Sequence, residues 1–297
     1  MAIPYLREIA FRYGEVDRLT PLIRRVIAHN PTPFTFHGTG TYIIGRGEVA
    51  VMDPGPELPE HIDAILAALE PGETVSHILI THTHNDHSPG AAPLQQRTGA
   101  KTYGFGPHGS GRPEGMVEEG GDRNFHPDVR LRDGDVVSGP GWTIEAIHTP
   151  GHCSNHLCYR LREERALFTG DHVMGWSTTI VSPPDGDMQA YMRSLGRLIA
   201  AEDAILWPTH GPPITDPQPF LKAYLAHRVD REKQVLEVLA GGPKTIHDLV
   251  DVLYATLDKR LIPAARRNIL AHLIALVETA RARCDGPPTL ESTYRLA

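Results

Sequence analysis

Short apolar runs followed by turn residues recur along the first two thirds of the chain and predict buried strands. Such runs cover residues 41–44, 49–52, 78–80, 142–147, 166–168 and 204–207, and two further strands are predicted over 22–28 and near 101–103. Apolar residues at helical spacing predict helices over 59–69, from Gly90 to about Arg97 and over about 187–200. Alternating strands and helices predict an α/β fold, in which functional side chains gather at the carboxyl ends of strands.

The last quarter of the chain has a different pattern, with helical spacing over 225–239, 246–253 and 266–280. Thr245 and Asp248 are placed to form a capping box at the second of these helices, and 289–296 is compatible with a strand. The pattern predicts a small helical, winged-helix-like domain over 222–297 that follows a larger domain over 1–221. Such a domain can contact nucleic acid, wall off a pocket or pair two chains, and the pattern leaves these alternatives open.

The composition is typical of a globular protein, with 297 residues of which 40% are hydrophobic and 22% charged. No apolar stretch approaches the length of about 20 residues that a membrane-spanning helix needs. The first residues carry Arg7, Glu8 and Arg12 instead of a signal-peptide core, so a cytoplasmic location is expected. The three cysteines form no CxxC pair, which argues against a disulfide framework or a thiolate zinc site.

Charge is distributed unevenly along the chain, whose net charge is −7. Residues 1–221 carry 17 basic and 27 acidic side chains, whereas residues 222–297 carry 12 and 9. A basic module points towards a polyanionic partner, although solvated helix faces give the same composition.

The densest group of ionisable residues lies in 81–87, directly after the apolar run 78–80. It contains His82, His84, Asp86 and His87. Ligand-type side chains packed this closely repel and desolvate one another unless a cation lies between them. The segment therefore predicts a metal site rather than a chance polar loop.

Two more ligand-type residues follow predicted strands in the same manner. Asp171 comes after the run 166–168, and Gly170 before it allows a close approach of the backbone. His210 comes after the run 204–207. Each residue alone would be an ordinary loop residue, but the repeated arrangement favours a shared site.

Two histidines compete for one role after the predicted strand 142–147. His148 lies at the strand end, and His152 lies beyond a Pro-Gly turn whose backbone freedom can aim a side chain back at a metal. The pattern favours His152 without excluding His148. Asp53, at the end of 49–52, is expected either to cap its loop or to orient a ligand-bearing loop by hydrogen bonds.

Four segments are similar to the metal-binding motifs of the metallo-β-lactamase-fold hydrolases. They are His82-x-His84-x-Asp86-His87, Thr149-Pro150-Gly151-His152, Thr169-Gly170-Asp171 and Pro208-Thr209-His210-Gly211. The resemblance implies two metal ions and selects His152 over His148. The implied ligands are His82, His84 and His152 for one ion, Asp86, His87 and His210 for the other, and Asp171 as the bridge. The implied fold is an αββα sandwich, two mixed sheets face to face with helices outside.

Within this superfamily the chain most resembles the beta-lactamase-like protein 2 group, almost from end to end. The similar segments are 30–33, 38–42, 170–175 with Thr178 and Thr179, and 224–228. Members of this group include a zinc-dependent endoribonuclease that acts on single-stranded RNA. The resemblance therefore implies a dinuclear zinc hydrolase whose substrate is RNA or a small molecule.

Three departures narrow the choice among relatives. Asp171 stands where one class of β-lactamases has a cysteine ligand. The glyoxalase-II-like thioesterases and the lactonases share the metal motifs, but the basic module does not resemble a glutathione-binding tail. No long insertion separates Asp171 from His210. The 38 residues between them include 176–179 and the helix 187–200, which are expected to form walls of the pocket.

The ligand set predicts a hydrolytic mechanism whatever the substrate is. Two divalent ions about 3.5–4 Å apart lower the pKa of a bridging water towards neutrality, and the resulting hydroxide is the nucleophile. Asp86 is the predicted catalytic residue, since it can help to move the proton or support the leaving group. Zinc is favoured by the imidazole-rich set, with manganese and iron as alternatives.

A further set of residues is expected to support the ligands or touch the substrate: Asp53, His148, His156, His172, Thr178 and Thr179. The segment 104–128 is expected to be a lid over the site or a long surface loop. One alternative to an RNA-cleaving enzyme is a hydrolase of small esters, thioesters or lactones, and another is a binding protein with a regulatory or redox metal. No membrane partner is expected, and self-association stays open.

Overall fold

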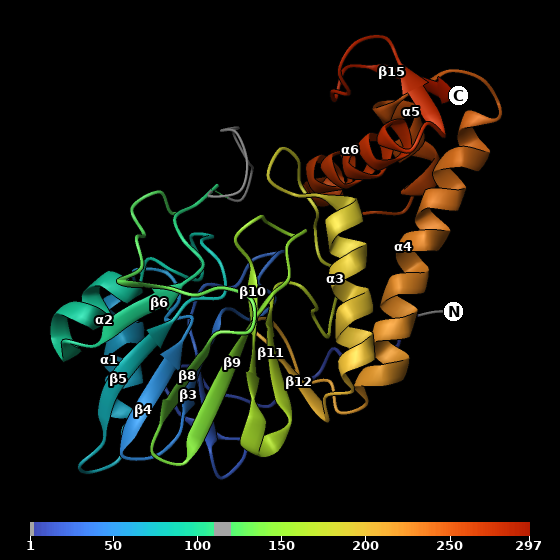
Figure 1. Cartoon of the computed structure of the whole chain (residues 1–297). Coiled ribbons are helices and arrows are strands. Elements are labelled where there is room, and N and C mark those ends of the chain that lie inside the picture. The colour runs from blue at the N-terminus through green and yellow to red at the C-terminus, as the bar shows by residue number, and fades with distance from the viewer. Residues whose placement is uncertain (1–2, 110–119) are drawn as a thin grey trace.

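The computed structural model describes residues 3–109 and 120–297. Two mixed β-sheets lie face to face, helices cover their outer faces, and a smaller module with its own sheet follows at the end of the chain (Figure 1). The predicted αββα sandwich is therefore confirmed.

The first sheet contains seven strands of the described chain, arranged in chain order. They are β1 Asp17–Arg18, β2 Ile23–Ile27, β3 Gly40–Ile44, β4 Glu48–Met52, β5 Thr74–Leu79, β6 Lys101–Gly104 and β7 Val129–Arg130. Pairing is antiparallel from β1 to β4 and parallel from β4 to β7. Helices α1 Pro59–Ala67 and α2 Ala91–Thr98 pack on the outer face.

The second sheet has the order β12-β11-β10-β9-β8. Its strands are β8 Val136–Gly139, β9 Trp142–His148, β10 Leu157–Leu161, β11 Ala166–Gly170 and β12 Ile205–Pro208, with the short helix η1 Arg162–Glu164 after β10. β11 and β12 pair in parallel, and the other pairs are antiparallel. Helices α3 Met188–Ala201 and α4 Pro217–Leu239 cover the outer face.

Residues of the first sheet are buried on both faces, which explains apolar runs without alternation. In β4, Ala50 and Met52 point between the sheets, whereas Val49 and Val51 point towards α1 and α2. Because successive side chains of a strand point to opposite faces, a strand covered on both sides reads as a continuous apolar run. Polar side chains can therefore gather at the ends of these buried strands, in the loops that follow them.

The C-terminal module packs around its own apolar cluster. Its elements are β13 Lys244–Thr245, α5 Ile246–Leu253, η2 Lys259–Leu261, α6 Ile262–Glu278, β14 Ala282–Cys284 and β15 Thr293–Leu296. The predicted capping box is confirmed, because Asp248 N donates to Thr245 Oγ1 at 3.2 Å and Thr245 N donates to Asp248 Oδ2 at 2.8 Å. Helix α6 begins earlier than its pattern predicted, since Pro263 is accommodated in the first turn.

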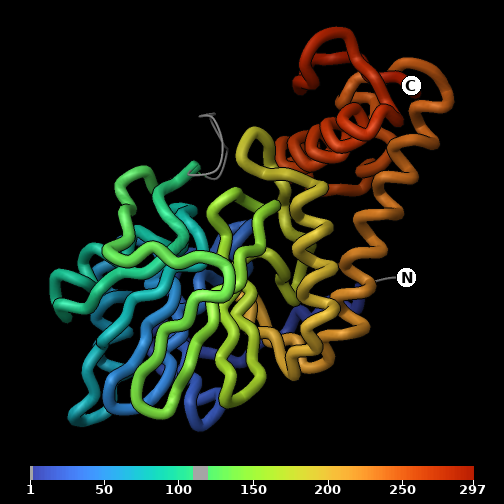
Figure 2. The backbone as a smooth tube through the Cα atoms, in the orientation of Figure 1, coloured from blue at the N-terminus to red at the C-terminus, as the bar shows by residue number. Residues whose placement is uncertain are grey.

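One helix connects the sandwich to the module. α4 runs through the predicted boundary at 221/222, with Phe220, Leu221 and Tyr224 in the cluster outside the second sheet. Its later residues Val235 and Leu239 belong to the C-terminal cluster, and the helix rises from the sandwich to the module (Figure 1, Figure 2). The exact division into 1–221 and 222–297 stays a prediction.

The apolar pattern missed β10, because Arg160 interrupts it with a charge that is paired to Asp203 at 2.6 Å. Part of the segment 104–128, expected to be a lid or a long loop, lies outside the described residues. None of the described helices combines the length and the apolar character needed to cross a bilayer.

Stability should fall in weak acid because His61 is buried as a neutral imidazole. Its Nε2 lies 2.8 Å from Thr41 Oγ1, whose own hydrogen goes to Asp53 O. Burial lowers the pKa of His61 to about 4, whereas an unfolded histidine has a pKa of about 6.5. The unfolded state thus binds a proton first as the pH falls, and His61 should remove about 2 kcal/mol of unfolding free energy between pH 7 and pH 5.

Urea unfolding of metal-free protein at these two pH values, with wild type and His61→Gln, measures this contribution. The variant should lose that part of the pH dependence, whereas His247→Gln, at an exposed position of α5, should keep it. An identical pH dependence in His61→Gln and wild type would contradict the prediction.

Candidate metal centre

The loops that follow β5, β9, β11 and β12 bring the predicted metal ligands together. Three overlapping groups have ligand atoms within 4.8 Å of one another and are suited to holding metal ions. They are His82 with His84 and His152, His82 with His87 and Asp171, and Asp86 with His87 and His210. The sequence predicted every member of these groups.

In the first group, imidazole lone pairs converge. His152 Nδ1 lies 2.7 Å from Ile180 O, a pure acceptor, so Nδ1 carries the hydrogen and Nε2 keeps its lone pair. His82 Nδ1 lies 3.0 Å from Thr81 Oγ1, whose hydrogen goes to Asp53, so the same assignment holds for His82. Both Nε2 atoms face His84 Nδ1, at 2.9 and 3.1 Å. Crowded lone pairs of this kind suit a cation between them.

The third group, together with Asp171, combines imidazoles with carboxylates. His87 Nδ1 faces Asp53 Oδ2 at 2.9 Å and His210 Nδ1 faces Gly38 O at 3.1 Å, so both Nε2 atoms point into the group. His210 Nε2 lies 3.1 Å from Asp86 Oδ2. Within the described chain, His87 Nε2, His210 Nε2 and Asp171 Oδ1 are buried without a hydrogen-bond partner. Buried polar atoms rarely stay unpartnered, and a metal ion would satisfy all three.

Asp171 lies between the first and the third group. Its Oδ1 is 3.4 Å from His210 Nε2 and 3.6 Å from His87 Nε2, while its Oδ2 is 3.9 Å from His152 Nε2. Each carboxylate oxygen thus faces a different group, as a bridging ligand requires. Gly170 has φ +51°, and a Cβ there would lie 2.6 Å from His156 Nε2, so the predicted close approach at this glycine is confirmed.

Burial and neighbouring charges set the protonation of the centre. Burial and the adjacent imidazoles lower the pKa of His82 and His84 well below the ordinary range, which keeps their nitrogens neutral. Burial raises the pKa of Asp86, but His87 and His210 outweigh it and hold that pKa below its usual value. The same balance lowers the pKa of Asp171. Burial lowers the pKa of His87 and His210, but the adjacent carboxylates outweigh it and raise both pKa values. Because neutral imidazoles and ionised carboxylates are the forms that bind metal, these two histidines would release their protons when an ion binds.

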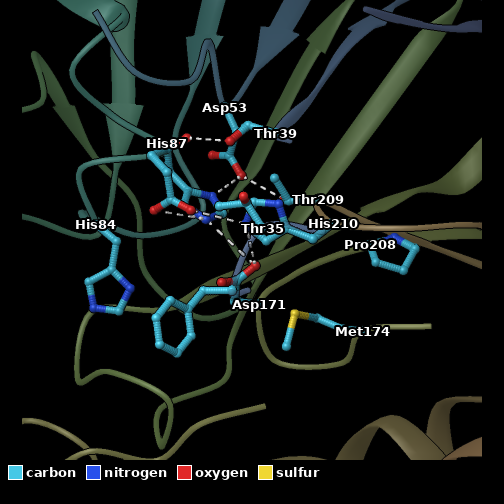
Figure 3. A network of polar contacts seen from close by, with 12 residues as sticks. Thr35, Thr39, Asp53, His84, His87, Asp171, Met174, Pro208, Thr209 and His210 are labelled. Carbon is cyan, nitrogen blue, oxygen red and sulfur yellow. Dashed lines mark hydrogen bonds and ion pairs between the residues drawn. The ribbon is translucent and has the colours of Figure 1, made fainter. Parts of the chain in front are cut away.

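The carboxylate of Asp53 connects three loops behind the ligands. It accepts hydrogen bonds from Thr81 N at 2.8 Å, Thr81 Oγ1 at 2.7 Å and Thr209 Oγ1 at 3.0 Å. With the contact to His87, these bonds tie the end of β4 to the ends of β5 and β12 (Figure 3). Of the two roles considered for Asp53, orientation of ligand-bearing loops matches these contacts.

Among the other predicted supporting residues, His156 and Thr179 contact Asp171. His156 Nε2 accepts from Asp171 N at 3.2 Å, and Thr179 Oγ1 donates to Asp171 O at 2.7 Å. His148 lies elsewhere, with its Nε2 3.0 Å from Ser154 O and its ring stacked on Phe105.

His172 is buried beside Tyr191, and its ring makes no hydrogen bond with any described residue. Its backbone oxygen accepts from the Tyr191 hydroxyl at 2.7 Å. His172 therefore supports the loop after β11 through its main chain.

A cavity of about 390 Å³ opens beside the centre. Its lining includes His84, Asp86, His152 and Asp171 at the metal centre, and Thr178 and Thr179 from the following loop. Its large apolar members are Phe34, Met174, Trp176, Ile180, Leu257 and Leu261. None of the described residues that line it is a lysine or an arginine, and none comes from α3. The prediction that 176–179 form a wall therefore matches the cavity, but the prediction for the helix 187–200 is wrong, because α3 packs on the outer face of the second sheet.

The C-terminal module, for which walling off a pocket was one predicted alternative, contributes cavity residues that the sequence did not single out. The lining residues are Tyr254, Leu257, Leu261, Ala264, Ala265 and Asn268. No local signal marks them, because apolar residues in a helix that line a cavity look the same as core residues.

The sequence matches two family models. The model described as the metallo-beta-lactamase superfamily matches residues 35–210, and the beta-lactamase associated winged helix domain matches residues 245–286. The winged-helix character predicted for the C-terminal module is therefore confirmed.

Two relatives from Aspergillus are similar to this chain over most of its length. The atrochrysone carboxyl ACP thioesterase of Aspergillus chevalieri is 35% identical over 255 residues, covering 82% of this chain and 77% of that protein. The lactamase-like protein adaB of Aspergillus niger is 30% identical over 294 residues, covering 94% of this chain and 87% of that protein. A metallo-beta-lactamase family protein from Thermus thermophilus has the same fold, with a TM-score of 0.76 at 23% identity, covering 94% of this chain and 100% of that structure.

The choice between His152 and His148 can be tested by metal content. The His152→Ala protein should fall from about two bound ions to about one, because the first group loses one of its three imidazoles. The matched His148→Ala protein should keep both ions. Elemental analysis of dialysed protein, with circular dichroism to verify folding, gives the answer. Equal metal loss in both variants, or none in His152→Ala, would contradict the geometry.

Proposed function

The chain belongs to the metallo-beta-lactamase superfamily of hydrolases, and on this premise we propose that it hydrolyses thioesters whose acyl group is largely apolar. The observation that carries the proposal is the position of the metal-suited cluster at one side of an apolar cavity. Hydrolysis adds the water oxygen to the acyl carbon and breaks the C–S bond, and the thiol takes up a proton.

The composition of the cavity argues against RNA as the substrate. Proteins that bind single-stranded nucleic acid track its phosphates with lysine and arginine and stack bases on aromatic rings. The described lining of this cavity contains neither cation, whereas Phe34, Trp176, Leu257 and Leu261 offer apolar surface. Apolar walls with a few placed polar groups are typical of small-molecule sites.

The names of the relatives support the same choice. One relative is named as a thioesterase that acts on an acyl group carried by an acyl carrier protein, and another is named only as lactamase-like. They favour the thioester alternative over the endoribonuclease function implied by the resemblance to the beta-lactamase-like protein 2 group. Esters and lactones remain second candidates, since their carbonyl carbon presents the same electrophile.

The C-terminal module is proposed to wall the pocket. Ala264, Ala265 and Asn268 lie in the first half of α6 and line the cavity. A helix that reads DNA needs one face free to enter a groove. The face of α6 that carries these three residues lines the cavity beside the metal-suited cluster instead, which favours a pocket wall over nucleic-acid contact by this face.

The proposed ligands would hold two divalent ions, with zinc favoured by the imidazole-rich donors and manganese or iron as alternatives. When bound, the ions supply Lewis acidity, which lowers the pKa of water and polarises the acyl carbonyl. Asp86 lines the cavity with 28% of its side chain exposed, compared with 12% for Asp171. As an ionised carboxylate at the cavity surface, Asp86 would support the leaving group or help to move a proton.

An activity panel tests the substrate class. Purified protein with a measured metal content should hydrolyse an acyl thioester faster than a lactone or a β-lactam and should leave single-stranded RNA intact. A chelator should abolish the activity, and added zinc should restore it. Preferential cleavage of RNA or of the β-lactam would show that the thioester proposal is wrong.

A pair of alanine substitutions tests whether the cavity holds the acyl group. Ala264→Leu adds three carbons inside the cavity and should raise KM for a long-chain acyl thioester about tenfold while leaving an acetyl thioester nearly unchanged. Ala255→Leu is the control, because Ala255 is exposed on a neighbouring segment and outside the described lining. Equal effects of Ala264→Leu on both substrates would contradict an acyl site in this cavity.

A further inference from the structure

The loop 171–181, between β11 and α3, positions two members of the metal centre. Asp171 begins the loop, and Ile180 near its end supplies the carbonyl that fixes His152 Nδ1 at 2.7 Å. The backbone of this loop therefore sets the bridging carboxylate and the orientation of one imidazole. What holds the loop in place also controls the geometry of the centre.

Tyr224 of α4 holds the loop from behind. Its hydroxyl donates to Ser177 O at 2.6 Å and accepts from Thr179 N at 3.0 Å and Met174 N at 3.3 Å. A phenol offers one hydrogen and two acceptor positions, so these contacts use its full capacity. The side chain is 0% exposed.

Arg228, one turn further along α4, reaches the same loop. It is 1% exposed. Its Nη2 donates to Thr179 O, its Nη1 lies 3.4 Å from Asn268 Oδ1, and its guanidinium lies 4.9 Å from the centroid of the Tyr191 ring. Asn268 of α6 in turn accepts from Val181 N at 3.3 Å. Two helices that contribute to the C-terminal module thus grip both ends of the segment 179–181.

The charge of Arg228 has no partner that would explain it as an ordinary ion pair. Among the described residues, no carboxylate lies within ion-pair distance of its guanidinium. A buried cation without an anion is costly, and an apolar side chain of similar length would fill the space at lower cost. The contact with Thr179 O therefore points to a specific role for the guanidinium.

Thr179 connects Tyr224 and Arg228 to the metal centre. Its main chain is bound by Tyr224 and Arg228, and its Oγ1 donates to Asp171 O at 2.7 Å. The path from α4 to the bridging carboxylate contains one residue between them. A shift of α4 relative to the sandwich would move Thr179, and with it the backbone of Asp171.

We propose that Tyr224 and Arg228 are positioning residues, through which the C-terminal helices set the metal affinity and geometry of the centre. The inference rests on the metal centre of the proposed function, but not on the choice of substrate. It gives a role to the segment 224–228, which the resemblance singled out and the proposed chemistry does not use.

The test compares two tyrosine hydroxyls. Tyr224→Phe removes the hydroxyl that binds the loop. Tyr294→Phe, the matched control, removes a hydroxyl of similar burial in β15 that donates to Thr289 O at 2.6 Å, away from the loop 171–181. Metal affinity is measured by competition with a chromophoric chelator, the geometry by the absorption spectrum of the cobalt-substituted protein, and stability by urea unfolding.

Tyr224→Phe should bind metal about 10- to 100-fold more weakly than wild type and should shift the cobalt spectrum. Tyr294→Phe should lose stability without either change. Arg228→Met should weaken metal binding in the same way, and Arg228→Lys should recover part of the loss, since an ammonium can still donate to Thr179 O.

Wild-type metal affinity and an unchanged cobalt spectrum in Tyr224→Phe would overturn the proposal and leave the residue a purely structural role. If Arg228→Met does not fold, the nearly isosteric Tyr224→Phe still decides. Both readouts need no substrate, so failure of the thioesterase proposal and failure of this one are distinguished by separate measurements.

Discussion

The hydrogen bonds to the Asp53 carboxylate are the contacts on which the metal centre most depends. Asp53 follows β4 with a φ of +47°, a left-handed conformation that costs about 1 kcal/mol or more for a residue other than glycine. In this position its two oxygens reach Thr81 and His87 in the loop after β5 and Thr209 after β12. A buried carboxylate is tolerable because these donors replace the water it has lost. The Asp53 side chain thereby fixes the loops that follow β5 and β12 relative to each other.

The side chains of the metal-suited cluster are packed differently from those in the rest of the fold. In the sandwich, apolar side chains fill the space between the sheets. At the ends of the strands, imidazole lone pairs and carboxylates face one another. Buried atoms such as His87 Nε2 lack hydrogen-bond partners within the described chain. Such local conflicts persist where a ligand resolves them, and the donors here are those that a divalent ion prefers. The sheets anchor the loops that carry these side chains and so keep them close together.

The C-terminal module supplies part of the wall of the cavity. Without it, the metal centre would open on one side to solvent, but α6 and the preceding segment supply Leu257, Leu261 and Ala264 as an apolar wall. The winged-helix pattern and the net positive charge of 222–297 suggested a polyanion as partner. The tertiary arrangement directs one face of α6 to the metal centre instead, so the module's role depends on how it docks and not on its own composition.

Local features of the sequence determined the helices, the strands with apolar runs, though not β8 or β10, and the first half of the site. The run 78–80 lacks alternation because its strand is covered on both faces. The close spacing of His82, His84, Asp86 and His87 in one short segment favours a cation between them. The repeated pattern at strand ends pointed to Asp171 and His210 and favoured His152. The resemblance implied their roles as ligands, and the fold brings them together from distant parts of the chain.

Tertiary structure alone decided that His148 turns away, that α3 is not a wall, and that Tyr224 and Arg228 hold the loop after Asp171. The physical reason is that periodicity reports whether a side chain is buried, whereas its partner depends on how separate elements pack.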